Sequence, residues 1–435
     1  MSEKIPELAQ QLNNELKETK NAAFELLSSR GRTAYFPSKG ILGQAAEAKG
    51  KSINATIGTA FEEDGSPLCL ECLEGMLSLP DTAFLYAPSF GSPEMRAQWR
   101  DRMYVKNPGL KEKTFSLPVV TNALTHALSI AGELFVDDGD TIILPDLYWD
   151  NYDLIFEHAY GARLETFTAF NGESFNVAGM KEMLLAEGKK KILLLNFPNN
   201  PAGYTTTVEE DEAIIQAIGE AAQAGKKLAI LLDDAYFGLV YEDGISSESL
   251  FSRLCDLHPN VLAVKMDGPT KEDYVWGFRV GFITFGIQGG TPAQYKALEA
   301  KAAGLVRGTI SNSSNISQQL LLQAYRHPDY AKQKKEKYEL LRRRYQKIKE
   351  LFAAHPEFSD SFAAKPFNSG YFMCVQLNGA DPETVRKKLL ASFDTGVIVL
   401  SGLIRLAYSS VPTDKLETLF TNLHAAVQQV KTETP

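Results

Sequence analysis

Short, continuous apolar runs that alternate with longer helical segments constrain the fold of this chain most strongly. The runs are rich in Ile, Leu and Val, which is typical of strands covered on both faces. Helical segments between such strands act as crossovers, so the pattern predicts an α/β fold with a mostly parallel sheet of about seven strands sandwiched by helices. Functional side chains are then expected on loops at the carboxyl ends of the strands. The clearest predicted strands cover residues 117–120, 141–145, 191–197, 228–233, 261–265 and 281–285.

The pattern changes at about residue 326, where a smaller α+β domain is expected to begin. Residues 330–352 form a predicted amphipathic helix, because apolar side chains recur there every three to four residues. Strands are predicted at 369–377, 397–400 and 404–409. The core-facing stripe of the helix consists of Tyr338, Leu341, Tyr345, Ile348 and Phe352.

The N-terminal segment is expected to complete the smaller domain. Residues 1–35 have a helical pattern with Leu8, Leu12 and Leu16 on one stripe. The predicted organisation is an N-terminal arm that forms part of the small domain, a large domain, and a C-terminal small domain. Their ranges are 1–66, 67–325 and 326–435.

Composition and charge exclude several classes of protein. The chain has 435 residues and a formal net charge of −9, which argues against a nucleic-acid or anionic-membrane surface. It contains neither a long apolar run nor a signal-peptide core, so we expect a cytoplasmic protein without a membrane span. Four cysteines are too few for a disulfide scaffold. Cys69 and Cys72 lack a second ligand pair for zinc, so we expect them on one helix face and predict no metal site.

Lys271 begins the most informative local pattern in the chain. Gly277, Arg279 and Gly281 follow it by six, eight and ten residues. A lysine that forms a Schiff base needs a desolvated amine, glycines let backbone approach a ligand, and an arginine fork suits a phosphate. Pyridoxal phosphate needs all three features. Most lysines are solvated surface residues, so the pattern gains weight only from segments elsewhere in the chain.

Polar side chains near the ends of other predicted strands provide that weight. Asn200 lies in a turn-rich loop after one strand, and Asp233 and Asp234 end another. A buried acid needs a cationic or donor partner, and a pyridinium N–H would be one. Arg405 lies inside an otherwise apolar strand, where it needs an anion, either structural or a substrate carboxylate.

Three motifs occur along the chain in a recognisable order. They are NPAG (200–203), DDAY (233–236) and K-x5-G-x-R-x-G (271–281), followed by the arginine of IRLAY at 405. In these motifs the chain resembles the pyridoxal phosphate-dependent, fold-type I aminotransferases of class I and II, the aspartate aminotransferase relatives. The resemblance spans most of the chain. It implies pyridoxal phosphate as cofactor, amino acid and 2-oxo acid substrates, and a homodimer with active sites at the interface.

The resemblance also implies roles for individual residues. Lys271 matches the lysine that holds the cofactor and moves the Cα proton, and Asp233 the carboxylate that faces the pyridine nitrogen, with Asp234 as the alternative. Tyr236 and Asn200 match the groups that hydrogen-bond the ring O3′. The other implied cofactor-binding residues are Arg279, Trp149, Ala123, Leu124, Thr125 and, from the second subunit, Tyr86. The implied substrate-binding residues are Arg405 for the α-carboxylate, Arg307 for a distal carboxylate, Asn200, Trp149 and Gly58.

Some positions depart from the family pattern. Gly268 stands where a phosphate-binding serine is usual, and Ala123 where the phosphate turn usually begins with glycine. Arg307 precedes Ser311 and Asn312 at the spacing of dicarboxylate-specific members, although a role in loop structure is as compatible with the sequence. We expect aspartate and 2-oxoglutarate as substrates. An aminotransferase of aromatic or other preference, a β C–S lyase and, remotely, a non-catalytic regulator stay open.

Overall fold

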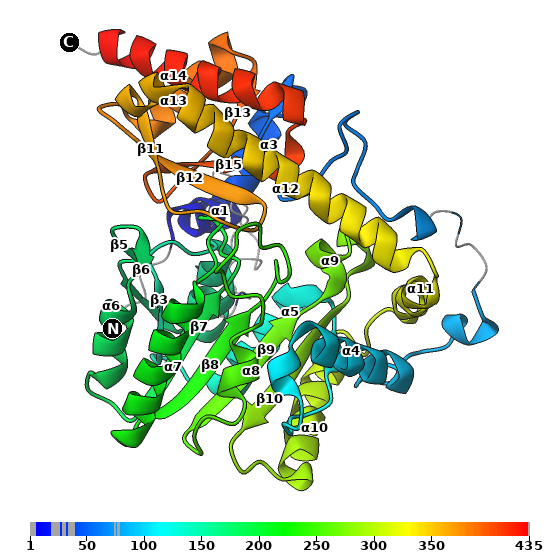
Figure 1. Cartoon of the computed structure of the whole chain (residues 1–435). Coiled ribbons are helices and arrows are strands. Elements are labelled where there is room, and N and C mark those ends of the chain that lie inside the picture. Colours follow the sequence, from blue (N-terminus) through cyan, green and yellow to red (C-terminus); the bar gives the residue numbers. More distant parts are fainter. Residues whose placement is uncertain are drawn as a thin grey trace.

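A seven-stranded sheet forms the centre of the larger part of the molecule (Figure 1). The computed structural model describes residues 6–18, 27, 32–33, 40–73, 75 and 79–433. Neighbouring strands from β9 to β4 are parallel, whereas β10 runs antiparallel to both of its neighbours. The predicted α/β fold with a mostly parallel sheet is thereby confirmed. The strand order is β2 (Val119–Thr121), β10 (Gly281–Ile287), β9 (Val261–Asp267), β8 (Lys227–Asp233), β7 (Lys190–Asn196), β3 (Thr141–Pro145) and β4 (Arg163–Phe167).

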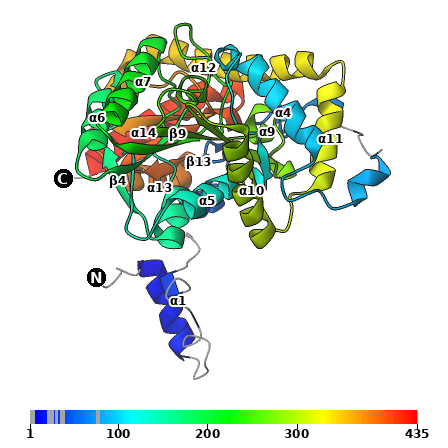
Figure 2. The same ribbon diagram turned by 90° about the horizontal axis from the view of Figure 1, so that it is seen from below.

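Helices cover both faces of this sheet (Figure 2). Alternate side chains of β7 enter different cores: Leu193 and Leu195 pack with the helices of one face, and Ile192 and Leu194 with those of the other. Both faces of the central strands are therefore apolar, which explains their continuous apolar sequence. The first face is covered by α4 (Pro93–Lys106), α6 (Val177–Leu185), α7 (Val208–Gln223) and α8 (Phe251–Leu254), the second by α5 (Ala123–Phe135) and α10 (Pro292–Thr309).

A smaller antiparallel sheet lies above the carboxyl edge of the large one (Figure 1). Helix α11 (Asn315–Arg326) leads into α12 (Tyr330–Ala354), which confirms the predicted long helix and buries Leu341, Tyr345 and Ile348 of its stripe. The sheet order is β11 (Phe362–Ala364), β12 (Phe372–Leu377), β15 (Leu403–Ala407) and β14 (Ile398–Leu400), with α13 (Pro382–Ser392) and α14 (Leu416–Glu433) packed on it.

The N-terminal segment joins this smaller part of the molecule. Strand β1 (Ile53–Asn54) pairs in parallel with β13 (Thr395–Gly396), and α3 (Ile41–Glu47) bonds through Gln44 to the backbone of Val399. Contacts from both ends of the chain thus build one α+β unit. The domain boundaries at 66/67 and 325/326 stay a proposal.

Two local predictions differ from the structure. Of the predicted helical segment 1–35, α1 (Glu7–Glu18) is helical, but Leu12 on the predicted stripe is 42% exposed, and the buried side chains are Ala9 and Asn13. Residues 1–5, 19–26, 28–31 and 34–39 lie outside the described residues. Cys69 and Cys72 do not share a helix face, because Cys69 precedes the three-residue helix η1 (Glu71–Leu73) that carries Cys72.

Several functional absences can be stated for the described part of the chain. It contains no disulfide among its four cysteines and no cluster of ligands for a metal ion. None of its helices combines the length and apolarity needed to cross a membrane. The cytoplasmic location stays a prediction.

Candidate active site

A cavity of about 300 Å³ opens at the carboxyl edge of the large sheet, next to β12 and β15 of the small one. Such a volume suits a small molecule. Most residues assigned by the sequence line it, although they come from segments up to 347 positions apart, from Gly58 to Arg405. The lining consists of Ile41, Gly58, Ala123, Leu124, Thr125, Trp149, Asn196, Asn200, Asp233, Ala235, Tyr236, Thr270, Lys271, Arg279, Phe372 and Arg405.

Lys271 enters the cavity from α9 (Pro269–Glu272), a single helical turn that follows β9. Burial lowers the pKa of its amine to about 8; the charge of Asp233 opposes this shift, and that of Arg279 adds to it. Its Nζ atom lies 4.9 Å from the centre of the Tyr236 ring. At a pKa of about 8, roughly a tenth of this amine is neutral at pH 7, far more than for an ordinary lysine, and a nucleophile or proton acceptor requires the neutral form.

Asp233 ends β8 and faces the same cavity. Its carboxylate accepts a hydrogen bond of 2.6 Å from the Tyr152 hydroxyl and one of 3.1 Å from the Ala235 amide. Burial raises the pKa of Asp233, whereas the Tyr152 bond and the charge of Lys271 act in the opposite direction. Tyr152 was not among the predicted residues, because a tyrosine in an aromatic segment is usually a core residue.

Asp234 is excluded as the alternative to Asp233 by its contacts. Its carboxylate is bonded to Lys265 and accepts a 2.6 Å bond from Ser249, and it does not line the cavity. The two adjacent acids thus point in different directions, and only Asp233 can meet a molecule in the cavity.

One end of the cavity combines donors that suit a phosphate. Helix α5 begins there at Ala123 and Leu124, and its free N–H groups can bind an anion. Arg279 has a left-handed backbone with φ of 53° and an exposed guanidinium. The hydroxyl of Thr270 is buried and has no hydrogen-bond partner among the described residues. An unsatisfied buried donor of this kind indicates that a ligand supplies the partner.

One of the two departures from the family pattern at this end, Gly268, has a steric reason. Ala123 adopts a positive φ of 61°, which would suit the usual glycine, and nothing in the structure explains the alanine there. A Cβ atom on Gly281 would lie 2.6 Å from the carbonyl carbon of Ala123, so only glycine fits beside that turn. A Cβ atom on Gly268 would lie 2.9 Å from the Val280 carbonyl oxygen, so a serine does not fit there either. Thr270 is the hydroxyl that reaches the cavity instead.

Arg405 provides a buried cation at the opposite side. It is 2% exposed, its Nη1 donates to Asn200 Oδ1 at 3.1 Å, and its Nη2 donates to the Thr56 carbonyl at 3.0 Å. No carboxylate in the described part of the chain forms an ion pair with it, and its Nε has no partner there. Burial lowers the pKa of this guanidinium. The charge of Asp150 acts in the opposite direction without a direct ion pair, and a buried cation without such a pair calls for an anionic ligand.

The remaining lining residues shape the space between these groups. Asn200 is oriented by Asn196, whose Oδ1 accepts from the Asn200 amide at 2.8 Å. Trp149 lies edge-on to Tyr152, with ring centres 5.7 Å apart. A Cβ atom on Gly58 would lie 3.3 Å from the Phe372 ring, so this glycine keeps the cavity open on that side.

Tyr86 and Arg307 do not reach the cavity of their own chain. Tyr86 is 90% exposed. Arg307, near the end of α10, is exposed, and its Nη1 donates to Ser311 Oγ at 2.6 Å. The resemblance places both residues in the site of a second subunit, and that role stays a prediction.

Comparison with known proteins identifies the relatives of the chain. The family model described as aminotransferase class I and II matches residues 64–423. An aspartate aminotransferase of Geobacillus stearothermophilus is 26% identical over 245 residues, which cover 56% of this chain and 57% of that protein. A probable aspartate/prephenate aminotransferase of Aquifex aeolicus is 25% identical over 272 residues, covering 61% and 63%. The alignments thus span 57% and 63% of these relatives' own lengths.

Solved structures agree with the fold. An aminotransferase from Anaerococcus prevotii matches with a TM-score of 0.79 and 23% identity over 92% of this chain and 98% of that one. A mitochondrial aspartate aminotransferase from Trypanosoma brucei matches with a TM-score of 0.71 and 20% identity over 88% and 99%. At these identities the likeness concerns the fold alone.

Proposed function

The chain belongs to the class I and II aminotransferase family, and on that premise we propose that it is a pyridoxal phosphate-dependent transaminase that moves an amino group from an amino acid to a 2-oxo acid. One observation carries the proposal: Lys271, Asp233 and Arg405 meet around one cavity. They offer an amine whose pKa is lowered to about 8, a buried carboxylate and a buried cation without an ion-pair partner in the described residues.

The donor set of the cavity fits pyridoxal phosphate. Lys271 would bond to its aldehyde carbon, and Asp233 would pair with its pyridinium nitrogen. Arg279, Thr270 and the start of α5 would hold its phosphate, and the unpartnered Thr270 hydroxyl supports that fit. When bound, the cofactor supplies a ring that takes up the electron pair left at Cα after proton removal.

The residues of the chain divide the remaining work among them. Arg405 binds the α-carboxylate of the substrate with its fork, which fixes the orientation of Cα. Lys271, once its amine is free and neutral, would remove the Cα proton and deliver it to the former aldehyde carbon of the cofactor, which lies across the amino nitrogen from Cα. Tyr152 donates to Asp233 and so favours its ionised form, and Tyr236 with Asn200 would provide polar atoms beside the ring. Together these residues bind and orient the substrate and move one proton.

For the substrates we propose aspartate as donor and 2-oxoglutarate as acceptor, within a homodimer. The support comes from the relatives described above, an aspartate aminotransferase and a probable aspartate/prephenate aminotransferase. The position of Arg307 and Tyr86 on the surface agrees with a contribution to a neighbouring subunit's site, where Arg307 would meet a distal carboxylate.

The test follows the visible spectrum of the purified chain with pyridoxal phosphate. We expect a lysine-bound absorbance that disappears in Lys271→Ala and persists in the matched surface variant Lys301→Ala, and borohydride reduction followed by peptide mass mapping should place the cofactor on Lys271. Aspartate should convert the bound cofactor to its amine form. If the absorbance survives Lys271→Ala, the assignment of the lysine is wrong. If cystathionine yields pyruvate while aspartate leaves the spectrum unchanged, the chain is a lyase.

A further inference from the structure

The two residues that follow Lys271 are buried acids, Glu272 and Asp273, which are 5% and 1% exposed. They end α9, whose four residues form one helical turn. A single turn is too short to hold its own shape, because the first hydrogen bond of a helix does not repay the backbone order that it requires. The geometry of Lys271 therefore depends on what holds these two acids.

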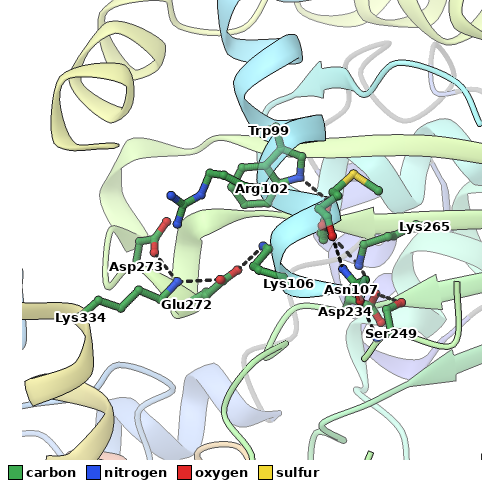
Figure 3. A network of polar contacts seen from close by, with 12 residues as sticks. Trp99, Arg102, Lys106, Asn107, Asp234, Ser249, Lys265, Glu272, Asp273 and Lys334 are labelled. Atoms are coloured by element: carbon green, nitrogen blue, oxygen red, sulfur yellow. Dashed lines mark hydrogen bonds and ion pairs between the residues drawn. The ribbon is translucent and has the colours of Figure 1, made fainter. Parts of the chain in front are cut away.

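Both acids are held from outside their own segment (Figure 3). Glu272 accepts from Lys106 Nζ of α4 at 2.9 Å and from Lys334 Nζ of α12 at 2.6 Å. Asp273 accepts from Lys334 Nζ at 2.8 Å and from the Tyr330 hydroxyl, also of α12, at 2.6 Å. One lysine of the smaller unit thus bridges consecutive carboxylates in the turn that carries Lys271.

These ion pairs determine the ionisation of Glu272. Burial alone would raise the pKa of this carboxyl, but the adjacent Lys106 and Lys334 outweigh burial and hold it well below its ordinary value. The charge of Asp273, followed by that of Glu272, raises the pKa of Lys334 against the effect of burial. The charged forms of Glu272 and Lys334 are therefore both favoured in the folded chain.

Stability alone does not account for such an arrangement. Buried ion pairs contribute little net stability compared with apolar side chains of the same volume, because each charge must lose its water. They can instead fix the orientation of the groups that they join, since a charge that moves away from its partner is left buried and uncompensated. Here the ion pairs orient the backbone that follows Lys271. The Lys271 carbonyl also accepts a 3.0 Å hydrogen bond from the Tyr371 hydroxyl.

We propose that Lys334 and Lys106 are positioning residues, which clamp Glu272 and Asp273 so that the reach of the Lys271 amine into the cavity depends on helix α12. The role of Lys271 that they serve rests on the proposed function. The clamp makes the larger and smaller units of the chain act together at the reacting amine, because Lys334 belongs to the helix that packs on the small sheet.

The first test measures the turn itself by hydrogen exchange in the full chain with pyridoxal phosphate. The reporters are the amides of Asp273 and Val275, which donate to the carbonyls of Pro269 and Thr270 at 2.8 and 3.1 Å. In Lys334→Met we expect these amides to exchange at least about tenfold faster.

Two controls separate positioning from general stability. Lys332→Met makes the same substitution in α12, at a side chain that is 75% exposed and pairs only distantly with Glu336, at 3.9 Å. Leu341→Ala destabilises the apolar core beside α12 at a fully buried site and removes no polar group. If either control accelerates the two amides as much as Lys334→Met does, the clamp is merely structural and the inference is overturned.

The second test measures the reactivity of the Lys271 amine through steady-state kinetics. Lys334→Met should lower kcat by about tenfold or more while KM for the amino donor, which Arg405 binds, changes by less than about twofold. Lys334→Arg should restore most of the rate, and Glu272→Gln should reproduce the loss if Lys334→Met fails to fold. A change in KM with an unchanged kcat would contradict the positioning role. If the native chain carries no cofactor on Lys271, the proposed function fails, whereas the exchange measurement still decides the clamp.

Discussion

Replacement of Arg405 by methionine tests the substrate grip most directly. Arg405 is 2% exposed, and its guanidinium carbon lies 4.4 Å from the centre of the Phe372 ring, where a methionine side chain also packs. The substitution removes the charge and the two donors to Asn200 and Thr56. It leaves the space largely filled, so the change concerns binding chemistry more than packing.

The magnitude follows from the burial of the guanidinium. Removing one member of a buried, hydrogen-bonded charge pair costs about 2–5 kcal/mol. At about 1.4 kcal/mol for each tenfold change, this corresponds to a loss in kcat/KM of about 30-fold to 4,000-fold for an α-amino acid. Burial lowers the pKa of this guanidinium, and no carboxylate of the described residues lies within ion-pair distance of it, so we expect Arg405→Met to unfold at a temperature no lower than the native chain does.

The assay compares two substrates in single-turnover experiments that follow the cofactor absorbance. One is the preferred amino acid, and the other is the amine that results from removing its α-carboxylate. The variant should lose rate with the amino acid but change by less than about threefold with the amine. Arg405→Lys, which keeps the charge without the fork, should lie between the two. Equal losses with both substrates would refute the grip, as would full activity with the amino acid.

Three further predictions concern the cofactor end of the cavity. Because the pKa of Lys271 is lowered to about 8, its neutral form increases between about pH 7 and 9 and then saturates. The rate at which the chain captures pyridoxal phosphate should follow the same curve. A rate that still rises tenfold per pH unit above pH 9 would contradict this pKa. Tyr152→Phe removes the 2.6 Å donor to Asp233, so the pKa of Asp233 should rise further. The acid limb of the pH–rate profile should then move to higher pH. An unchanged acid limb would show that Tyr152 has no influence on the reacting groups. Thr270→Val should leave the thermal stability of the cofactor-free chain unchanged or higher. It should weaken cofactor binding by about 10-fold to 150-fold, because one hydrogen bond to a charged group contributes about 1.5–3 kcal/mol; equal affinity measured by equilibrium titration would rule out the phosphate contact.

The strands of the large sheet were predictable where both of their faces are buried. The run at 141–145 coincides with β3, and that at 228–233 lies within β8. Strand β4 was not predicted, because it lies at the edge of the sheet and buries only Phe167. Its sequence, RLETF, carries no continuous apolar run. Edge position is decided by the order of strands, which no local pattern contains.

The site residues likewise divide into those that the local sequence predicts and those that it does not. Lys271, Asp233 and Arg405 could be assigned because each has an unusual local setting: a glycine–arginine pattern, an acid at a strand end and a cation in an apolar strand. Tyr152 and Thr270 have no such setting. Tyr152 meets Asp233 across 81 positions of sequence, and the orphaned Thr270 hydroxyl can be recognised only once its surroundings are known.

The sequence by itself determined the buried strands of the sheet, the order of the motifs and, through them, the family, because periodicity and residue type are local properties of the chain. Only the tertiary structure decided which of two adjacent aspartates faces the cavity, why Gly268 and Gly281 admit no side chain, and that Lys334 of a distant helix holds the turn of Lys271. The physical reason is that desolvation, steric exclusion and ion pairing depend on neighbours in space, and the neighbours of a residue in space are set by the whole fold.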